Sequence, residues 1–310
     1  MKVLHLGLCV NPHGFSSFPH AFKKVLGESN YRELQCSSDT AFNPNAIAIF
    51  NEFKPDLVFM QIQAENIIHA QTCEYFLSHG AKVINWTGDK RHVIPNWMID
   101  IAPFVSLTAF SNMDDVKMMR QMGYKSEYLE IGFDEDIYCP QGEVYPIQDI
   151  VFFANNYGVG HFPMSEYRIK LVQFLRNNYG DKFGVYGSGW SDGNGNANHS
   201  QHVEAKYLRG AKIVINCSHF NAERYNSDRL LRTLGTGAFC LSAKHNGMEQ
   251  DYTHQEHLAY FNTFEELRHR IDFYLDNEHE RKRIAENGRN LVLNRNTFVH
   301  QVENIIKLAE

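Results

Sequence analysis

Strand-like and helix-like segments alternate along this chain, and no other feature restricts its fold as strongly. Amphipathic helical patterns cover residues 46–53, 66–78 and 113–122. The apolar runs around them are typical of buried strands and cover residues 2–9, 56–62, 82–86 and 104–110. Continuous apolar strands that alternate with such helices predict a parallel sheet covered by helices on both faces. The first half of the chain is therefore expected to form a Rossmann-like domain.

The alternation stops between residues 132 and 149 and then starts again. This interval is acidic, contains two prolines and lacks helical or strand periodicity, which indicates an interdomain linker. Beyond it, strand-like runs cover residues 150–155, 182–187, 211–217, 238–241 and 257–261. Helical patterns lie around residues 167–177, before residue 207 and at Arg229, and three more helical segments end the chain. The sequence thus predicts an α/β protein with two Rossmann-like α/β/α domains.

The composition narrows the class of protein further. A hydrophobic content of 43% indicates a globular chain, and a net charge of -6 gives no reason to expect nucleic acid as an obligatory partner. The six cysteines form no CxxC pair, so we expect reduced thiols. No apolar stretch approaches the length of a membrane span, and no signal peptide is recognisable. We therefore expect a cytoplasmic protein without a transmembrane helix.

Ordered motifs run through the last third of the chain. An amphipathic segment opens with an N-cap-like Ser227-Asp228 and ends at Gly235 and Gly237. Arg229 lies in its first turn, where free backbone N–H groups and a guanidinium together favour an anion. The series of motifs reads Ser227-Asp228-Arg229, Gly237-Ala238-Phe239, Gly247-Met248-Glu249, Glu266-Leu267, Arg283-Ile284-Ala285-Glu286-Asn287-Gly288 and Thr297-Phe298.

This series resembles the nucleotide-sugar domain of GT-B glycosyltransferases, specifically the CgeB-like, "glycosyl transferases group 1" branch. The resemblance implies a GT-B fold with two Rossmann-like domains that face a central cleft. It implies an N-terminal acceptor domain over residues 1–140 and a nucleotide-sugar-binding domain over 141–295. Residues 296–310 would form a helix that returns to the first domain. The implied activity is transfer of a hexose or pentose from a nucleotide diphosphate sugar.

Donor-binding candidates follow the strand-like runs of the second domain. Such a reaction needs groups that neutralise a diphosphate and hold sugar hydroxyls. Arg229 is the first candidate for the diphosphate, and Glu249 is placed to accept hydrogen bonds from sugar hydroxyls. The loop after the run at 150–155 and the glycine-tryptophan turn after the run at 182–187 would shape the nucleotide pocket. The full set of expected donor contacts is Asn155, Asn156, Tyr157, Arg168, Gly187, Ser188, Gly189, Trp190, Ser227, Asp228, Arg229 and Glu249.

Two residues of the first domain are candidates for the catalytic base. Asp89 follows the run at 82–86, and His13 lies in the loop after the first run, beside Gly14, which we assign to the acceptor side. A carboxylate or an imidazole at such a position can deprotonate an acceptor hydroxyl. We favour Asp89, because the loop after that run is where an acceptor hydroxyl could approach the donor.

No residue pattern indicates a metal or a cofactor. The sixteen histidines show no zinc-ligand spacing. Asp134-Glu135-Asp136 imitates the D-x-D metal motif of other glycosyltransferases, but it lies in the linker rather than behind a strand of a nucleotide domain. We therefore assign no metal ligand and expect a metal-independent reaction.

The chain departs from many retaining GT-B enzymes at two positions. Those enzymes carry two glutamates eight residues apart, and the corresponding positions here are Arg224 and Arg232. An inverting displacement with one general base is therefore favoured. The acceptor stays open among polysaccharide, protein, small molecule and modified DNA base. A nucleotide-sugar epimerase and a non-catalytic nucleotide-sugar-binding assembly protein remain as alternatives.

Overall fold

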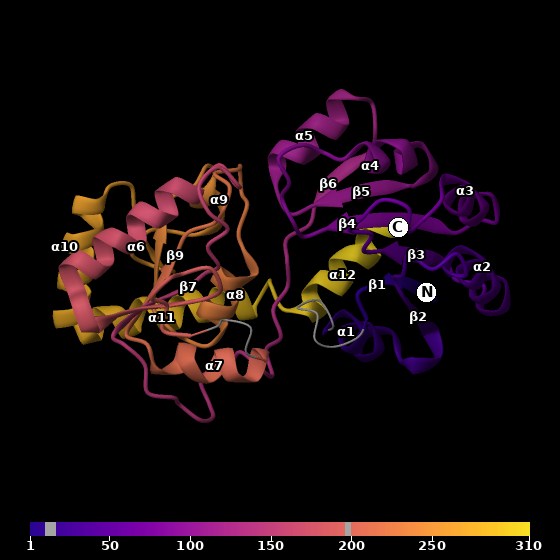
Figure 1. The fold of residues 1–310 in the computed structure, drawn as a ribbon. Coiled ribbons are helices and arrows are strands. Elements are labelled where there is room, and N and C mark those ends of the chain that lie inside the picture. Colours follow the sequence, from indigo (N-terminus) through magenta and orange to yellow (C-terminus); the bar gives the residue numbers. More distant parts are fainter. Residues whose placement is uncertain (10–16, 196–199) are drawn as a thin grey trace. The chain divides into compact units, whose positions relative to one another are not determined.

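The computed structural model describes residues 1–9, 17–195 and 200–310, which divide into two α/β units (Figure 1). Unit 1 contains residues Met1–Gly132 together with the C-terminal segment Phe298–Glu310. Unit 2 is continuous and contains residues Phe133–Thr297. The last helix, α12 (Phe298–Ala309), thus belongs to the N-terminal unit.

The sequence-based boundary at residues 140 and 141 is misplaced, because residues 133–140 belong to unit 2. Phe133 forms an isolated β-bridge with Thr297, and a Cβ on Gly235 would meet the Phe133 ring at 2.4 Å. The Tyr138 hydroxyl donates to a Glu204 carboxylate oxygen at 2.7 Å. These contacts fix the segment to unit 2, so the division falls between Gly132 and Phe133.

Unit 1 is built on a six-stranded parallel sheet with the order β2-β1-β3-β4-β5-β6. Its strands are β1 (Val3–Gly7), β2 (Tyr31–Gln35), β3 (Leu57–Met60), β4 (Lys82–Thr87), β5 (Leu107–Phe110) and β6 (Ser126–Tyr128). The helices are α1 (Ser17–Leu26), α2 (Phe42–Phe53), α3 (Ala70–Ser78), α4 (Asn96–Ile101), α5 (Met113–Gln121) and α12. Parallel strands joined by helical crossovers confirm the predicted Rossmann-like topology.

Helices cover both faces of this sheet. On one face α1 packs against α12 (Figure 1). The centres of the Phe18 and Phe298 rings lie 4.8 Å apart. On the other face, α2 and α3 contribute Phe50 and Phe76 to a core that includes Val58 of β3. Alternate residues of each buried strand therefore enter two separate apolar layers.

The sequence analysis missed two strands, β2 and β6. Both lie at the edges of the sheet, where only part of each strand is buried. The segment Tyr31–Gln35 reads YRELQ and lacks the apolar run that marks the central strands. A partly buried strand is specified by backbone pairing more than by an apolar pattern, so its sequence carries a weaker signal.

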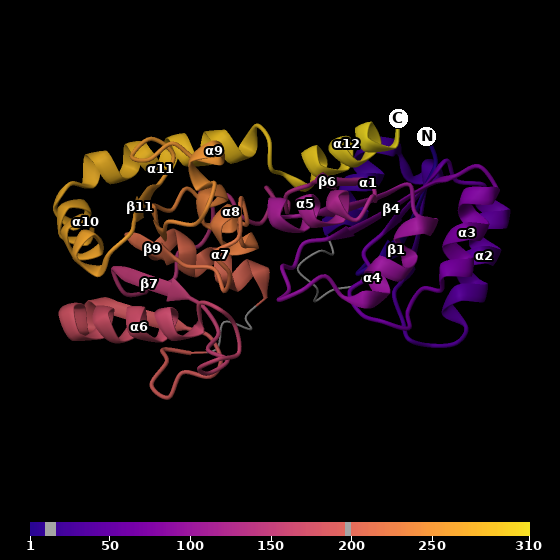
Figure 2. The same ribbon diagram turned by 90° about the horizontal axis from the view of Figure 1, so that it is seen from above.

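Unit 2 contains a five-stranded parallel sheet with the order β11-β10-β9-β7-β8. Its strands are β7 (Ile150–Phe153), β8 (Phe183–Tyr186), β9 (Ile213–Asn216), β10 (Cys240–Ala243) and β11 (Ala259–Phe261). The helices are α6 (Ser165–Tyr179), α7 (Gln201–Gly210), α8 (Asp228–Gly235), α9 (Met248–Asp251), α10 (Phe264–Asp276) and α11 (Glu278–Leu293). Figure 2 shows α10 and α11 following one another along this unit.

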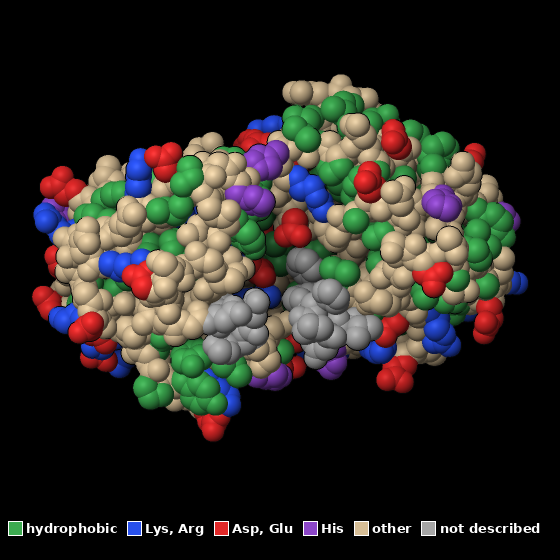
Figure 3. All heavy atoms as spheres, in the orientation of Figure 1, with side chains coloured by type: hydrophobic (Ala, Val, Ile, Leu, Met, Phe, Trp, Pro, Cys, Tyr) green, Lys and Arg blue, Asp and Glu red, His purple; other side chains and the backbone are tan. Residues whose placement is uncertain are grey.

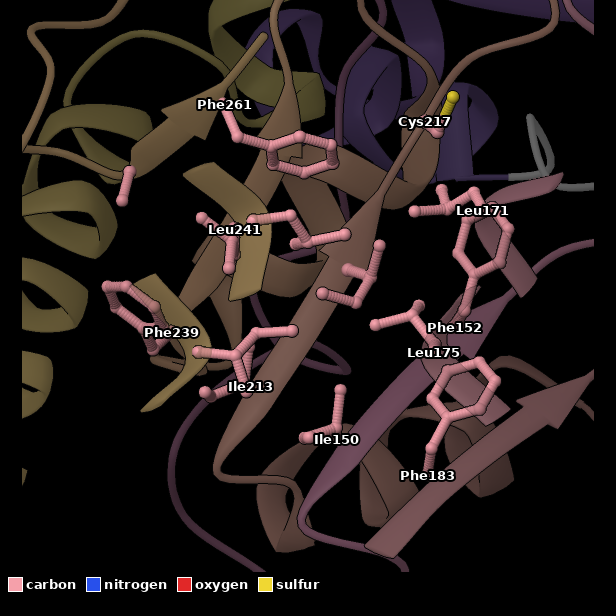
Figure 4. Close-up of a cluster of buried hydrophobic side chains, with 14 of the residues drawn as sticks. Ile150, Phe152, Leu171, Leu175, Phe183, Ile213, Cys217, Phe239, Leu241 and Phe261 are labelled. Atoms are coloured by element: carbon pink, nitrogen blue, oxygen red, sulfur yellow. The ribbon is translucent and has the colours of Figure 1, made fainter. Parts of the chain in front are cut away.

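One apolar cluster joins the sheet of unit 2 to its helices. Ile150 and Phe152 of β7 lie beside Leu171 and Leu175 of α6, with Phe239 at the far side of the cluster (Figure 4). Helix α10 adds Ile271 to the same cluster. Helix α8 contacts β9 and β10, which places its N-terminus near the carboxyl ends of these strands. Ligands of doubly wound sheets bind at this edge.

A buried histidine in unit 1 couples its stability to pH. His5 of β1 is fully buried among aromatic rings, with Nδ1 at 2.8 Å from the Tyr31 hydroxyl and Nε2 at 2.7 Å from Gln61 Oε1. Burial lowers the pKa of His5 to about 4, and the hydrogen bond with Gln61 opposes this only in part. The unfolded chain, with an ordinary histidine pKa, binds a proton at higher pH than the folded one. Stability is therefore lost as pH falls from about 6.5 towards 4.

We predict that His5→Phe flattens this pH dependence. At pH 7.5 the variant should be less stable by about 1–3 kcal/mol, because Tyr31 and Gln61 lose a buried partner. The difference should shrink towards pH 4.5, because there His5 takes up a proton in the unfolded wild-type chain but stays largely neutral in the folded one. Urea denaturation at both pH values measures this. His20→Phe, on the exposed side of α1, is the control and should follow the wild-type curve. A constant difference at both pH values would contradict the prediction.

Candidate functional site

Two loops of unit 2 are joined at the carboxyl ends of β7 and β8. The Ser188 N–H donates to Asn155 Oδ1 at 3.0 Å, and the Asn156 N–H donates to the Ser188 carbonyl at 2.9 Å. The Trp190 indole N–H donates to the Ala154 carbonyl at 2.7 Å. The structure thus brings together two loops that the sequence analysis had assigned separately to the nucleotide.

Glycine is required where these loops meet. A Cβ on Gly187 would lie 2.0 Å from the Ala154 carbonyl oxygen, and one on Gly189 would lie 2.0 Å from the Asn156 carbonyl oxygen. Gly189 also has a φ of +80°, which L-residues adopt rarely. The two glycines therefore allow the backbones of the loops to approach closely. The Trp190 indole N–H is already used in the bond to Ala154.

Arg168 lies in the first turn of α6 and is only 2% exposed. Its guanidinium lies 5.4 Å from the centre of the Phe152 ring, and Nη1 contacts the His219 ring nitrogens. Its Nε and Nη2 atoms are buried without a hydrogen-bond partner. A buried guanidinium with two unsatisfied nitrogens is costly unless an anion completes its coordination.

Positive charge gathers around Arg168. Burial, and after it the nearby charge of Arg229, lowers the pKa of Arg168 to about 10. Burial also lowers the pKa of His219 to about 3, with added repulsion from Arg168 and Arg229. His219 is therefore neutral at pH 7, and the two arginines form a cationic pair. Arg168 and Arg229 were both predicted donor contacts, and the structure places them in one group.

The sequence analysis missed His219. It follows β9 in the segment before α8, with its ring 5.3 Å from Tyr157 and 4.5 Å from Phe162. The Met164 N–H donates to the His219 carbonyl at 3.1 Å, which links this segment to the start of α6. A single histidine in an irregular segment carries no sequence signal that separates it from the fifteen others.

Ser227 and Asp228, two of the predicted donor contacts, bond to other side chains of unit 2. Ser227 is the N-cap residue of α8, but its hydroxyl donates to Asn216 Oδ1 at 3.4 Å and makes no capping bond. Asp228 Oδ2 lies 2.8 Å from Arg232 Nη2. Burial opposes ionisation of Asp228, but Arg232 and then Arg229 hold its pKa below the usual value. Its carboxylate thus orders α8, and a direct contact with a diphosphate would be repulsive.

Glu249 lies in α9, beyond the carboxyl end of β10. Its side chain is 54% exposed, and Oε2 lies 3.5 Å from Lys244 Nζ. Between β9 and β10 the structure also shows a hollow whose lining includes Asn216, Ser218, Lys244 and His245. Glu249 borders this region through Lys244, so its predicted contact with a sugar hydroxyl stays a prediction.

In unit 1, Asp89 is exposed directly after β4. Its N–H lies 3.4 Å from Thr87 Oγ1, and the Ser111 hydroxyl donates to the Gly88 carbonyl at 2.8 Å. The next residue, Lys90, forms a largely buried ion pair with Asp115 at 2.6 Å. The loop that carries Asp89 is thus held from both sides. The other predicted residues of this domain, His13 and Gly14, lie outside the described residues.

The two arginines at the glutamate positions of retaining enzymes are both ion-paired. Arg224 makes a two-point contact with Asp251, at 3.0 and 2.7 Å. Arg232 contacts Asp228 and also Glu204, at 3.1 Å. Burial disfavours the charge of Arg232, but these carboxylates and Tyr138 raise its pKa above the usual value. Both positions hold structural ion pairs.

Two kinds of feature are absent from the described part of the chain. Within residues 1–9, 17–195 and 200–310, no group of three or more histidine, cysteine or acidic side chains is arranged to hold a metal ion. Asp134 Oδ1, from the D-x-D-like segment, accepts the Asp136 N–H at 3.1 Å in a turn. None of the helices in those ranges is both long enough and apolar enough to cross a membrane.

Solved structures share this two-unit α/β architecture. A glycosyltransferase from Rickettsia africae aligns with a TM-score of 0.66 and 12% identity, covering 99% of this chain and 97% of that one. Anabaena Alr3699/HepE in complex with UDP aligns with a TM-score of 0.63 and 13% identity, covering 99% of each. Sucrose-phosphate synthase from Thermosynechococcus elongatus gives 0.63 and 9%, covering 99% and 98%. At these identities the alignments show a common GT-B fold.

A family comparison narrows the class. Residues 168–307 match the family model described as "Glycosyl transferase-like". Together with the GT-B fold, this match shows that the C-terminal part of the chain is similar to glycosyltransferases, as its motifs indicated. The CgeB-like branch is a finer assignment and stays a prediction. No curated protein matches the chain at a significant level.

We predict that Arg232→Met destabilises unit 2 strongly. The change leaves the Asp228 and Glu204 carboxylates without their shared cation, and breaking a buried ion pair from one side costs about 3–5 kcal/mol. Thermal unfolding of the intact chain measures the loss. Arg229→Met, three residues earlier on the same helix, is the matched control and should change the melting temperature little. Equal losses in the two variants would show that the ion pairs of Arg232 are not what stabilises α8.

Proposed function

We propose that this protein transfers a sugar from a nucleotide diphosphate sugar to an acceptor hydroxyl, without a metal ion. The match of residues 168–307 to a glycosyl transferase-like family model supports sugar transfer. The structural relative HepE was solved with UDP, with UDP and glucose, and with UDP-glucose. A nucleotide sugar of this chemical type is the donor we propose for unit 2. Hexose and pentose donors both fit the proposal, as does a cytoplasmic site of action.

One observation carries the proposal: Arg168 is a buried cation whose coordination is incomplete. Two of its guanidinium nitrogens have no partner, and the charge of another arginine, Arg229, acts on it. A diphosphate supplies the missing negative charge and several acceptor oxygens at once. Arg229 lies in the first turn of α8, where free backbone N–H groups also favour a phosphate. Two arginines and a helix terminus can neutralise a leaving diphosphate without a cation.

The joined loops at β7 and β8 complete the proposed donor site. Asn155, Asn156, Tyr157 and the turn Gly187–Trp190 occupy the strand ends beside Arg168, where a nucleoside would lie. In unit 1 we propose Asp89 as the general base, which takes the proton of the acceptor hydroxyl as the anomeric bond breaks. Because Arg224 and Arg232 replace the glutamate pair of retaining enzymes, an inverting displacement is the mechanism we propose. Polysaccharide, protein, small molecule and modified DNA base all fit as acceptor classes.

The distribution of charged side chains on one face of the molecule (Figure 3) agrees with a small anion-binding site and not with an extended basic surface. Lysine, arginine and acidic side chains are interspersed over the face shown in Figure 3. An acidic chain with mixed surface charge supports recognition of one diphosphate more than of a long phosphate backbone. A modified DNA base as acceptor would therefore need local contacts outside such a backbone footprint.

Isothermal titration with UDP-, GDP-, ADP- and TDP-sugars in the presence of EDTA tests the proposal. We expect at least one donor to bind with EDTA present. Failure of every donor would reject it. An acceptor-free change of the bound sugar, followed by NMR, would instead indicate a nucleotide-sugar epimerase. Binding without nucleotide release, whatever the acceptor, would indicate an assembly protein.

We predict that Arg168→Met and Arg229→Ala each weaken donor binding by at least about tenfold, because a charge-assisted hydrogen bond contributes about 1.5–3 kcal/mol. Without ligand, Arg168→Met should be as stable as the wild type or more stable, since it removes a buried charge that lacks a counterion. Calorimetric affinity and the melting temperature of the ligand-free protein measure the two effects. Unchanged affinity with a large fall in melting temperature would mark either arginine as structural.

We predict that Asp89→Asn lowers turnover by about 10²–10⁴-fold, the usual contribution of a general base, while donor affinity stays near that of the wild type. Steady-state kinetics with the donor that binds measures this. His13→Ala is the comparison. Full activity in Asp89→Asn with a loss in His13→Ala would move the role to His13. Activity in both would show that neither residue is the base.

A further inference from the structure

One side chain that lines the hollow between the ends of β9 and β10 has a ring nitrogen that no protein group uses. His245, which follows β10, lines this hollow and is only 9% exposed. Its Nε2 lies 3.0 Å from Asn226 Oδ1. An amide oxygen can only accept, so Nε2 carries the proton and Nδ1 presents a lone pair. Nδ1 is buried and has no partner.

The side chains around His245 are largely satisfied among themselves. Asn216 Nδ2 donates to Ser242 Oγ at 2.9 Å, and Asn221 Oδ1 accepts the Asn246 N–H at 2.9 Å. These bonds hold the walls of the hollow in place. Burial lowers the pKa of His245 to about 4, although Asp251 and Glu249 oppose the shift, so the ring is neutral at pH 7. An unpaired acceptor in a fixed polar wall is suited to one ligand donor group.

The hollow lies near the arginine pair. Cys217 lines it, and the thiol of Cys217 senses the charge of both Arg168 and Arg229. In the sheet order β10-β9-β7-β8, the proposed nucleoside loops lie at β7 and β8, and the hollow lies at β9 and β10. With a diphosphate at the arginines, the nucleoside would lie towards β7 and β8, and the sugar would lie towards β9 and β10.

We propose that His245 is a sugar-specificity residue, whose Nδ1 accepts a hydrogen bond from one hydroxyl of the donor's sugar. This inference rests on the proposed function, because it requires a nucleotide sugar at the arginine pair. It goes beyond that function by assigning the sugar to the β9–β10 hollow and by naming the atom that reads one of its hydroxyls. The sugar must then present an O–H donor to that wall.

The test compares UDP with UDP-glucose by calorimetry in the wild type and in His245→Phe. We expect UDP affinity to stay within about twofold, while the UDP-glucose affinity falls by about 3- to 10-fold, the effect of one neutral hydrogen bond. His279→Phe, whose side chain is 91% exposed on α11, is the matched control and should change neither affinity. Equal losses for UDP and UDP-glucose would overturn the proposal, because the contact would then be with the nucleoside diphosphate. No loss for either would overturn it as well.

Deoxy analogues identify the hydroxyl and do not depend on how well the variant folds. UDP-glucose analogues that lack one hydroxyl at a time are titrated against the wild type, His245→Gln and His245→Phe. One analogue should bind the wild type about 3- to 10-fold more weakly and lose nothing further in His245→Phe. Additive losses for every analogue would overturn the proposal.

A second nucleotide distinguishes a failure of this inference from a failure of the proposed function. If the UDP pair does not bind, the same comparison is made with GDP and GDP-mannose. Binding of a nucleoside diphosphate with no effect of His245 on the sugar rejects this inference and leaves the proposed function standing. Failure of every diphosphate rejects the proposed function, and the inference falls with it.

Discussion

An incompletely coordinated guanidinium sets the requirements for the rest of unit 2. Arg168 is taken out of water by α6 and Phe152, yet the structure surrounds it with another cation and a neutral imidazole. Burial of such a charge costs several kcal/mol, which the remaining core must offset. The apolar cluster beneath the sheet supplies that stability (Figure 4). Strain of this kind is expected at sites that bind anions, because the ligand removes the repulsion.

The second constraint is the helix that carries Arg229. Helix α8 is held by Arg232, which contacts Asp228 on the same helix and Glu204 on α7. Glu204 also accepts the Tyr138 hydroxyl, so the linker segment is part of the same network. Arg232 pairs with both carboxylates, and Arg229 interacts with Asp228 electrostatically. Arg229 lies in the first turn of α8, beside the free N–H groups of the helix. The positions that hold glutamates in retaining enzymes thus carry structural cations, which agrees with a different catalytic arrangement.

The sequence predicted the fold well because its central strands are continuous apolar runs. The order of strands and helices from β7 to α12 follows the predicted alternation, and the misplaced boundary at residue 140 arose because a linker pattern does not say which unit holds the segment. Arg168 and Arg229 could be predicted from helix starts and motif order. His219 and His245 could not, because their meaning depends on burial and on neighbours such as Asn226 that are distant in sequence. The edge strands β2 and β6 escaped detection for a related reason, since partial burial weakens the apolar pattern.

The order of strands in the sheet of unit 2 determines which candidate residues lie next to one another. Parallel strands bring their carboxyl ends to one edge, so residues from β7, β8, β9 and β10 meet there although they span almost a hundred residues of sequence. The central strands β7 and β9 precede the helices that carry the two arginines, and the neighbouring strands β8 and β10 precede the polar groups proposed to distinguish one ligand from another. Charge at the centre gives affinity for any nucleoside diphosphate, whereas an unpaired neutral acceptor such as His245 Nδ1 discriminates between sugars. A buried acceptor left unpaired penalises a sugar that lacks the matching hydroxyl more than it rewards the one that has it. On this proposal, selectivity for the donor sugar depends on the segment after β10, and it can change by substitution there without loss of the diphosphate site.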